Sequence, residues 1–319
     1  MSMLYALNYL IFAAFMTLFL FEAGIAASLL LFYGRLREPM LKYLMPIWEI
    51  TGTFAVFYIV NFIASFPRLI NVVGHLYIAP LLAAVMFFIV RNAALAYSEY
   101  MHTPSRRTYH YIYAVSTLVV AYIAVAVLSS GISGIGVNAS TMHANLAAIM
   151  LNPFNVLVFA AVALIGLALA GMFFMESMHK AYLALAPAGV TLIAAAALLY
   201  DGSALASALG PDAWLLAAVI AALAASIALW LAGKRIARYA MLAWLFFAVD
   251  AFGAFQYPYL FGGSIRITDY LNSAAVGSAT TLVTLVGGLS LTIAMVFFVY
   301  IVYIKKPSEG KTGSTGGDY

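Results

Sequence analysis

Cysteine is absent from this sequence of 319 residues. Its absence excludes a disulfide framework, a thiolate metal site and a cysteine nucleophile. The sequence also lacks a Walker lysine loop, a Gly-x-Ser-x-Gly nucleophile elbow and a His-Glu-x-x-His metal motif. The usual signals of nucleotide-dependent and hydrolytic enzymes are therefore missing.

Charged residues are scarce as well, at 8% of the chain, whereas 66% of the residues are hydrophobic and the mean hydropathy is +1.04. A water-soluble globular protein of this composition would lack the polar surface that it needs. The net charge of +4 and the pI near 9.1 are compatible with nucleic-acid binding, but Lys and Arg stand in short clusters between apolar runs. Such clusters are typical of topology signals. We therefore predict a polytopic protein in a lipid bilayer, with no nucleic-acid partner.

Nine apolar runs are long enough to cross a hydrocarbon core about 30 Å thick, which takes about 20 helical residues. Helices are expected because each satisfies its own backbone hydrogen bonds, and the alternation of a membrane barrel is absent. The predicted spans are 4–33, 44–66, 72–98, 109–130, 153–177, 181–200, 212–232, 238–261 and 276–304, with the fifth and sixth divided near Glu176 to Lys180. The prediction is a single all-α transmembrane domain over 1–305, followed by a Gly-rich, disordered tail over 306–319.

Basic residues predict the orientation of these spans. Those assigned to the ends of odd-numbered spans are Arg35, Arg37, Lys42, Arg91, Arg106, Arg107, Lys180, Lys234, Arg235, Arg238, Lys305, Lys306 and Lys311. Only Arg68 and Arg266 fall in the other loops. The positive-inside rule places the amino terminus outside and the carboxyl terminus in the cytoplasm, as an odd number of spans requires. The first run has no preceding basic residue and no cleavage signal, so we expect a retained span and not a signal peptide. The outer loop 131–152 has no charged residue and has room for a short interfacial helix.

Haem and metal binding can be tested against the positions of the histidines. All five lie at the ends of predicted helices or in loops: His75, His102, His110, His143 and His179. A haem in a bilayer usually takes His or Met axial ligands near the middle of helices. The fourteen Met residues are scattered, and Met in an apolar helix is more often a packing residue than a ligand. We therefore expect this chain to bind no haem by itself, and no metal.

Three carboxylates stand inside the predicted spans: Glu22, Glu49 and Asp250. An ionised carboxylate is costly in hydrocarbon, so such a residue is by default a hypothesis of function. At 1.5 Å per residue, Glu22 and Asp250 lie about 18 Å from the cytoplasmic ends of their helices and Glu49 about 8 Å. The functional interpretation is a proton or cation route; the alternative is that each acid only packs or accepts hydrogen bonds. For Glu49, near the cytoplasmic mouth and close to Thr51 and Thr53, the functional interpretation is favoured.

The surroundings of Glu49 suggest how it would work. We expect Ile47, Ile50 and Phe54 to keep it poorly solvated while a short water-filled mouth connects it to the cytoplasm. Glu22, about 10 Å deeper, would be linked to it only through water or a residue of another chain.

Four separated segments carry a resemblance to a known family. Phe21–Gly24 resembles a Gly-Phe-Asp-x-Gly segment, with Glu22 at the acid, and Pro46–Glu49 resembles a Pro-x-Trp-Asp/Glu motif. The second segment also includes Phe66–Pro67, which is similar to the Phe-Pro or Trp-Pro that closes the helix begun by Pro46–Glu49. Leu151–Phe154 resembles a Leu-Asn-Pro-Phe that opens a helix.

The fourth segment, Tyr257–Leu260, resembles a Phe-Pro-Tyr-Leu helix end that is followed by a Ser-rich approach to the last helix. The order and spacing of these segments are similar to those of subunit II of the cytochrome bd-type quinol oxidases. The motif positions carried over are Pro46, Trp48, Pro67, Asn152, Pro153 and Pro258.

The sequence also departs from that family. Ile50, Thr51 and Phe54 stand where the family continues Trp-Asp-Gly-Asn-x-Val-Trp, and Glu22 is longer than the usual Asp. Asp250 has no assignable counterpart, and the sixth and seventh helices show no likeness. These departures are compatible with a divergent branch, such as one of archaeal type.

The resemblance implies nine helices, arranged as two four-helix bundles plus a peripheral helix, in a prokaryotic plasma membrane. It implies a heterodimer with a haem-bearing subunit I, which carries haem b and haem d, oxidises quinol and reduces oxygen to water. Subunit II would have no catalytic residue of its own. It would add stability and part of a cytoplasmic proton path, with Glu49, Glu22 and Asp250 as candidates, and in some members an oxygen path.

Two other classes of function use the same residues differently. An ion-coupled secondary transporter would use the intramembrane acids for coupling, but the two halves show no paired Gly/Pro-broken helices, the usual pointer to a midplane site. In a scaffold or assembly protein all three acids would only pack.

Overall fold

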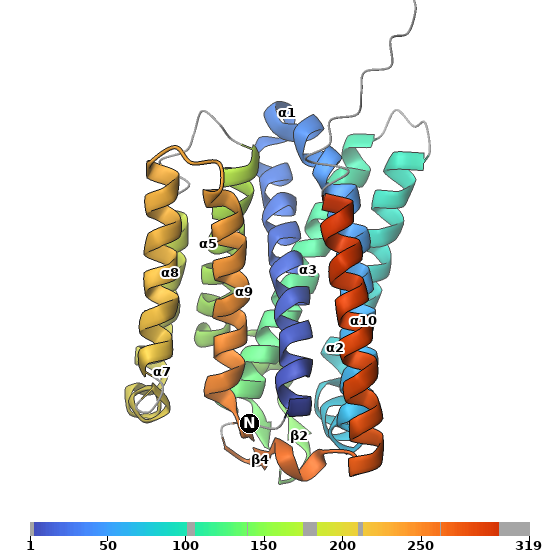
Figure 1. Ribbon diagram of the computed structural model, residues 1–319, viewed down its shortest axis with the longest axis vertical. Helices are drawn as coiled ribbons and strands as arrows, with labels where there is room; N and C mark the ends of the chain where they lie inside the picture. Colours follow the sequence, from blue (N-terminus) through green and yellow to red (C-terminus); the bar gives the residue numbers. More distant parts are fainter. Residues whose placement is uncertain are drawn as a thin grey trace, which may run out of the picture.

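The computed structural model describes residues 3–100, 106–138, 140–174, 184–209, 213–261 and 263–299. Long helices run side by side along the vertical axis of Figure 1, and short strands and turns close the end that carries the amino terminus. The helices are α1 (Met3–Ser65), α2 (Pro67–Tyr100), α3 (Arg106–Ser133), α4 (Leu146–Met150), α5 (Pro153–Phe174), α7 (Leu185–Leu209), α8 (Ala213–Leu231), α9 (Ala237–Gln256) and α10 (Ala274–Val299). The predicted tail 306–319 and the predicted division near Glu176 to Lys180 lie outside the described residues.

The all-α membrane architecture is confirmed. Eight helical segments among the described residues are long and apolar enough to cross a membrane, and Leu185–Leu198 of α7 is a shorter apolar segment. Each of these segments overlaps one of the nine predicted runs, but the number of spans stays a prediction. Their grouping into two four-helix bundles and the orientation of the termini stay predictions.

Helix α1 contains the first two predicted spans. Only Phe32, with φ −134° and ψ 28°, leaves the helical region between Met3 and Ser65. The first two predicted spans are therefore joined by a kink and not by a loop, because residues 35–42 continue as helix. The spans on either side of this connection are Met3–Gly34 and Tyr43–Ser65.

Helix α2 begins at Pro67, five residues before the predicted start at 72. Proline is well suited to the first helical position, where its missing N–H would have no intrahelical partner. A kink at Tyr77, with φ −120° and ψ 17°, precedes Pro80 inside the helix. The ring of Pro80 crowds the preceding turn, which accounts for a kink at this place.

The loop between α3 and α5 contains the predicted short helix, α4, and also a hairpin that was not predicted. Strands β1 (Val137–Asn138) and β2 (His143–Ala144) pair antiparallel. Helix α5 begins at Pro153 as predicted, and Asn152 Oδ1 accepts a 2.8 Å hydrogen bond from the Phe154 N–H. Asn152 thus caps a helix whose first residue is proline, which explains the Asn-Pro pair.

Helix α9 ends at Gln256, and the predicted end at 261 is wrong. Tyr257 adopts extended angles, φ −67° and ψ 136°, because a residue before proline avoids the helical region. The Tyr257–Pro258 peptide bond is cis. The chain then forms β3 (Tyr259–Leu260), which pairs with β4 (Ile265–Arg266), and the 3-10 helix η1 (Ile267–Tyr270).

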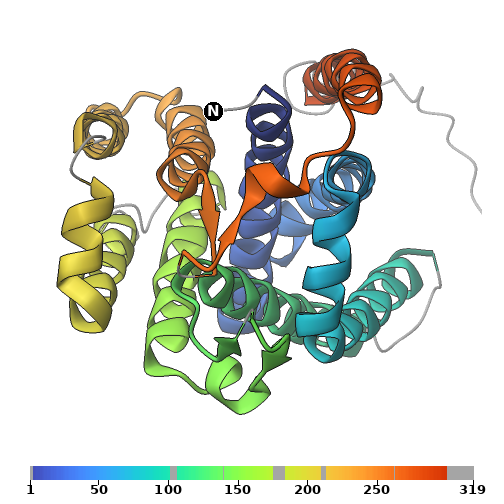
Figure 2. The same cartoon turned by 90° about the horizontal axis from the view of Figure 1, so that it is seen from below.

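Helix α1 is the centre of the packing and contacts α3, α5, α9 and α10 (Figure 2). Its closest approach is to α5, where a Cβ added to Gly24 would lie 2.0 Å from the Gly166 carbonyl oxygen. In a membrane, helices gain little from hydrophobicity and associate through such close packing of small residues. Gly24, two residues after Glu22, therefore lets α1 lie directly on α5.

Candidate functional site

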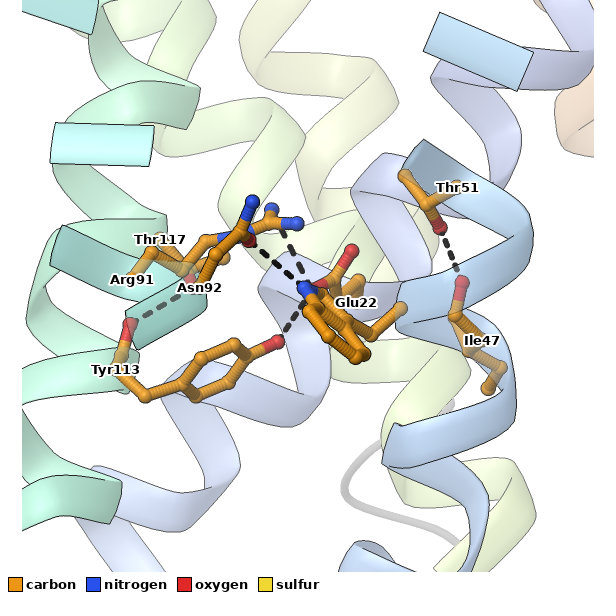
Figure 3. A network of polar contacts seen from close by, with 8 residues as sticks. Glu22, Ile47, Thr51, Arg91, Asn92, Tyr113 and Thr117 are labelled. Carbon is orange, nitrogen blue, oxygen red and sulfur yellow. Dashed lines mark hydrogen bonds and ion pairs between the residues drawn. The ribbon is translucent and has the colours of Figure 1, made fainter. Parts of the chain in front are cut away.

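A buried ion pair joins α1 and α2 inside the helical core. Glu22 Oε1 lies 3.4 Å from Arg91 Nη1, and both side chains are fully buried (Figure 3). Tyr113 of α3 donates its hydroxyl to the same carboxylate oxygen. The Arg91 guanidinium lies 4.5 Å from the centre of the Phe88 ring, a distance at which a cation is attracted to an aromatic face. Three helices thus converge on one charge pair.

The pair is not fully hydrogen-bonded. Glu22 Oε2 and both terminal nitrogens of Arg91 are buried without a hydrogen-bond partner among the described residues. Buried charges persist only where attraction and hydrogen bonds offset their desolvation. Removal of either partner would leave a buried charge without that compensation.

The network continues from Arg91 to the residue before Glu49. Asn92 Oδ1 accepts a 3.2 Å hydrogen bond from Arg91 Nε and a 2.7 Å hydrogen bond from Trp48 Nε1. The predicted motif residue Trp48 therefore faces α2 and does not stand free at the membrane surface. The chain of contacts runs from Glu22 through Arg91 and Asn92 to Trp48.

Glu49 points away from α2, unlike Trp48. Its side chain is exposed on the outside of α1, whereas Ile47 and Phe54 are buried. The expectation that Ile47 and Phe54 shield Glu49 is wrong, because a helix turns about 100° per residue and places both on the opposite face. Of the two threonines, Thr53 is exposed and donates a 2.9 Å hydrogen bond to the Glu49 carbonyl, but Thr51 is buried and bonds to Ile47.

Glu49 also lines a large open cavity. The cavity has a volume of about 1810 Å³ and walls that are almost entirely apolar. Trp48, Asn92 and Thr53 line the same cavity as Glu49. The carboxylate is thus accessible from outside the bundle, in contrast to Glu22, which has no exposed surface.

Asp250 belongs to a different part of the molecule. It is partly buried in a cavity of about 400 Å³ between α8 and α9, whose wall includes Tyr9 and Trp244. Trp244 Nε1 donates a 3.0 Å hydrogen bond to the Val219 carbonyl and so joins these two helices. The structure therefore brings together Glu22 with Arg91, and Trp48 with Asn92, but leaves Asp250 outside this network.

The three described histidines lie in different surroundings. His75 and His143 are exposed, the former in α2 and the latter in the β1–β2 hairpin. His110 is buried, but its Nδ1 lies 2.9 Å from the Tyr33 hydroxyl and its Nε2 lies 3.8 Å from Glu99 Oε1. Both ring nitrogens of His110 are thus directed at protein oxygens. Within the described part of the chain, no group of three or more His, Asp or Glu side chains is placed to hold a metal ion.

Arg91 is the functional residue that sequence reasoning misplaced. It was counted among the basic residues at a helix end, but it is fully buried inside α2, nine residues before the end at Tyr100. A signal was present in the sequence, because an Arg inside an apolar run normally pairs with an acid. Which acid it meets depends on how the helices pack.

The fold and these contacts define an all-helical, multi-pass membrane protein with ionisable residues inside its spans. The family model described as cytochrome bd terminal oxidase subunit II matches residues 2–303, so the chain belongs to this family. The predicted family is thereby confirmed. No curated protein sequence matches the chain.

A solved structure has the same fold. It is a chain of the bd oxidase from Geobacillus thermodenitrificans, with a TM-score of 0.76 and 20% sequence identity. The match covers 96% of this chain and 100% of that chain. The protein is thus a membrane subunit of a terminal oxidase of the prokaryotic plasma membrane, in a family that functions with a partner subunit in a complex that uses haems.

Proposed function

We propose that this chain is the subunit of a quinol:oxygen oxidoreductase that bears no haem. Its partner, subunit I, carries the b-type and d-type haems, oxidises quinol and reduces oxygen to water. Family membership and the poor fit of His75, His110 and His143 to haem ligation support this division. This subunit stabilises the partner and supplies a route for protons from the cytoplasm.

Glu49 is the proton-accepting group of this route, and its outward position on a membrane span carries the proposal. A carboxylate that faces lipid without a partner is costly, so the face that holds Glu49 must meet water or another protein chain. The partner subunit is the chain that this family provides. Glu49 then lies between the cytoplasmic water and the partner, where it takes a proton onto its carboxylate and releases it to an acceptor on subunit I.

Glu22 and Asp250 have other roles in this proposal. Glu22 is occupied by Arg91 and Tyr113, and a proton taken up by its carboxylate would leave Arg91 as a buried cation without a counterion. Asp250 lies between α8 and α9, away from the face of Glu49. The route therefore uses Glu49 and does not pass through the other two acids.

Glu49→Gln tests the proposal, because glutamine keeps the volume and hydrogen bonding of glutamate but cannot carry the proton. In the purified complex we expect about hundredfold slower oxygen reduction with unchanged haem content, at the low end of the range typical of lost acid–base groups. Glu49→Asp should be milder. Asp250→Asn is the matched control, since it makes the same chemical change in another span and should leave the rate unchanged. Normal turnover of an assembled Glu49→Gln complex across pH would reject the route.

The division of haem between the subunits has its own test. The reduced-minus-oxidised visible spectrum of the complex should retain its haem bands after this subunit is stripped from subunit I in detergent. Haem that stays bound stoichiometrically to this chain would reject the assignment.

A further inference from the structure

The second span of α1 packs on the bundle through one narrow face, which includes the buried residues Leu44, Ile47, Thr51 and Phe54. In Tyr43–Ser65 only 22% of an 18-residue window is buried, and the span is apolar on nearly all sides. Apolar side chains gain no more from facing a helix than from facing lipid, so hydrophobicity alone does not choose a face. Close packing of the buried face and specific polar contacts together make that choice.

In the half of this span that is predicted to lie toward the external side of the membrane, the polar contacts involve Asn61 and Ser65. The Thr284 hydroxyl of α10 donates to Asn61 Oδ1, and Asn8 Nδ2 of the first span donates to Ser65 Oγ at 2.7 Å. In the half toward the predicted cytoplasmic side, Trp48 Nε1 donates a 2.7 Å hydrogen bond to Asn92 Oδ1. Glu49 follows Trp48 directly, so this inner contact is the one that governs where Glu49 points.

The orientation of the Asn92 side chain is itself fixed. Its Oδ1 accepts from both Trp48 Nε1 and Arg91 Nε, and an amide nitrogen in that place would set donor against donor. Arg91 in turn is held by Glu22 and by the Phe88 ring. The buried charge pair therefore holds Asn92 in place, and Asn92 in turn holds the indole of Trp48.

We propose that Arg91 and Asn92 are positioning residues that hold the Glu49 carboxylate on the outer face of α1 through Trp48. With the indole turned toward α2, the next residue is rotated by about 100° and faces away from the bundle. Without that hydrogen bond the cytoplasmic half of the span loses its contact with Asn92, while Asn61 and Ser65 still hold the other half. The direction of Glu49 is then less firmly fixed. The inference rests on the proposed role of Glu49, but the position of residue 49 can be measured independently.

The kinetic test uses Asn92→Leu, which removes the acceptor at similar volume, and Asn92→Asp, which restores an acceptor for both donors. Asn92→Leu removes the acceptor of both Trp48 Nε1 and Arg91 Nε. From the loss of the Trp48 hydrogen bond alone we expect oxygen reduction about fivefold slower, and a rate near that of the parent in Asn92→Asp. Ser98→Ala is the control on α2. Ser98 is buried, and among the described residues its side chain bonds only to the Leu95 carbonyl of its own helix, so its loss should leave the rate unchanged.

A double variant separates positioning from general damage. If Asn92 acts through Glu49, adding Asn92→Leu to Glu49→Gln should cause no further loss of rate. Multiplied losses, or a parent rate in Asn92→Leu alone, would overturn the positioning role and leave the proton role of Glu49 standing.

The second readout is geometric and needs no proton transfer. Because the chain has no cysteine, Glu49→Cys places a single thiol at this position. In the assembled complex we expect Asn92→Leu, but not Ser98→Ala, to change the alkylation rate of that thiol by N-ethylmaleimide by about fivefold, followed by the mass of this chain. An unchanged rate would reject the positioning role, whereas a changed rate would support it even if Glu49→Gln turned over normally and the proposed proton route failed.

Discussion

The two membrane spans of α1 are covalently continuous but are stabilised differently. In Met3–Gly34, 72% of an 18-residue window is buried, against 22% in Tyr43–Ser65. Each span carries one glutamate. Glu22 is enclosed with Arg91 and Tyr113, whereas Glu49 is exposed and lies in the wall of an open cavity.

This difference shows how a membrane protein can keep an acid within its hydrocarbon-spanning region. Inside the bundle, the acid needs a partner from the same chain, and Arg91 supplies it. On the outer face, the acid needs water or another chain, and the surface around Glu49 is the place where that contact is required. The buried Glu22 is suited to stabilising the fold, and the exposed Glu49 is suited to exchanging protons.

The largest expected effect is on the buried pair. Arg91→Met should destabilise the assembled subunit by about 3–5 kcal/mol, because it leaves Glu22 without its counterion. Glu22→Gln should be comparably harmful for the reciprocal reason. The double variant should regain most of the loss, since no uncompensated charge remains. Thermal unfolding of the purified complex in detergent measures all three, and additive losses would contradict the ion-pair assignment.

A smaller effect is expected from adding one methyl group to a glycine of each span. Gly24→Ala would place its Cβ 2.0 Å from the Gly166 carbonyl oxygen, whereas Gly52 has nothing within 4 Å of that position. We expect a loss of about 1–3 kcal/mol for Gly24→Ala from overpacking. Gly52→Ala should be neutral or slightly stabilising, because alanine favours the helix.

The same melting experiment compares these two variants directly. Equal stability of Gly24→Ala and Gly52→Ala would contradict the close approach of α1 to α5. It would also remove the contrast in packing between the two spans.

Much of the fold could be predicted from the sequence, because length and hydropathy alone indicate membrane spans. The predicted ends of the helices were wrong where a proline, and not hydropathy, determined where a helix begins or ends. Pro67 opens α2 early, and Pro258 ends α9 before its apolar run ends. The hairpins β1–β2 and β3–β4 have two-residue strands, which are too short to show a period in the sequence.

The site was predictable only in part. Glu22 and Glu49 stand out because acids are rare in apolar runs, and Trp48 through its motif. The partners of these residues come from α2 and α3, and no pattern along the chain indicates that Arg91 meets Glu22 or that Asn92 meets Trp48. The exposure of Glu49 depends on the rotation of a span that is apolar all round, which hydropathy does not encode.

The proposed role of Glu49 depends on which end of the molecule faces the cytoplasm. Lys234 and Arg235, in the turn between α8 and α9, lie at the predicted cytoplasmic end, and the β1–β2 hairpin lies at the other (Figure 1). Two exposed positions report on these ends, Ala232 beside the turn and Ser140 in the hairpin.

Cysteine substitutions at these two positions should have the smallest effect on stability, since substitutions of exposed surface residues usually change it by less than about 0.5 kcal/mol. With no native cysteine in the chain, Ala232→Cys and Ser140→Cys are single probes for a membrane-impermeant thiol reagent in intact cells. Ser140→Cys should react, and Ala232→Cys should react only after the membrane is opened. The reverse pattern would invert the topology and move Glu49 to the external side, where it could not collect protons from the cytoplasm. The assignment of Glu22 as a buried counterion would survive that result, because the ion pair does not depend on which side of the membrane is cytoplasmic.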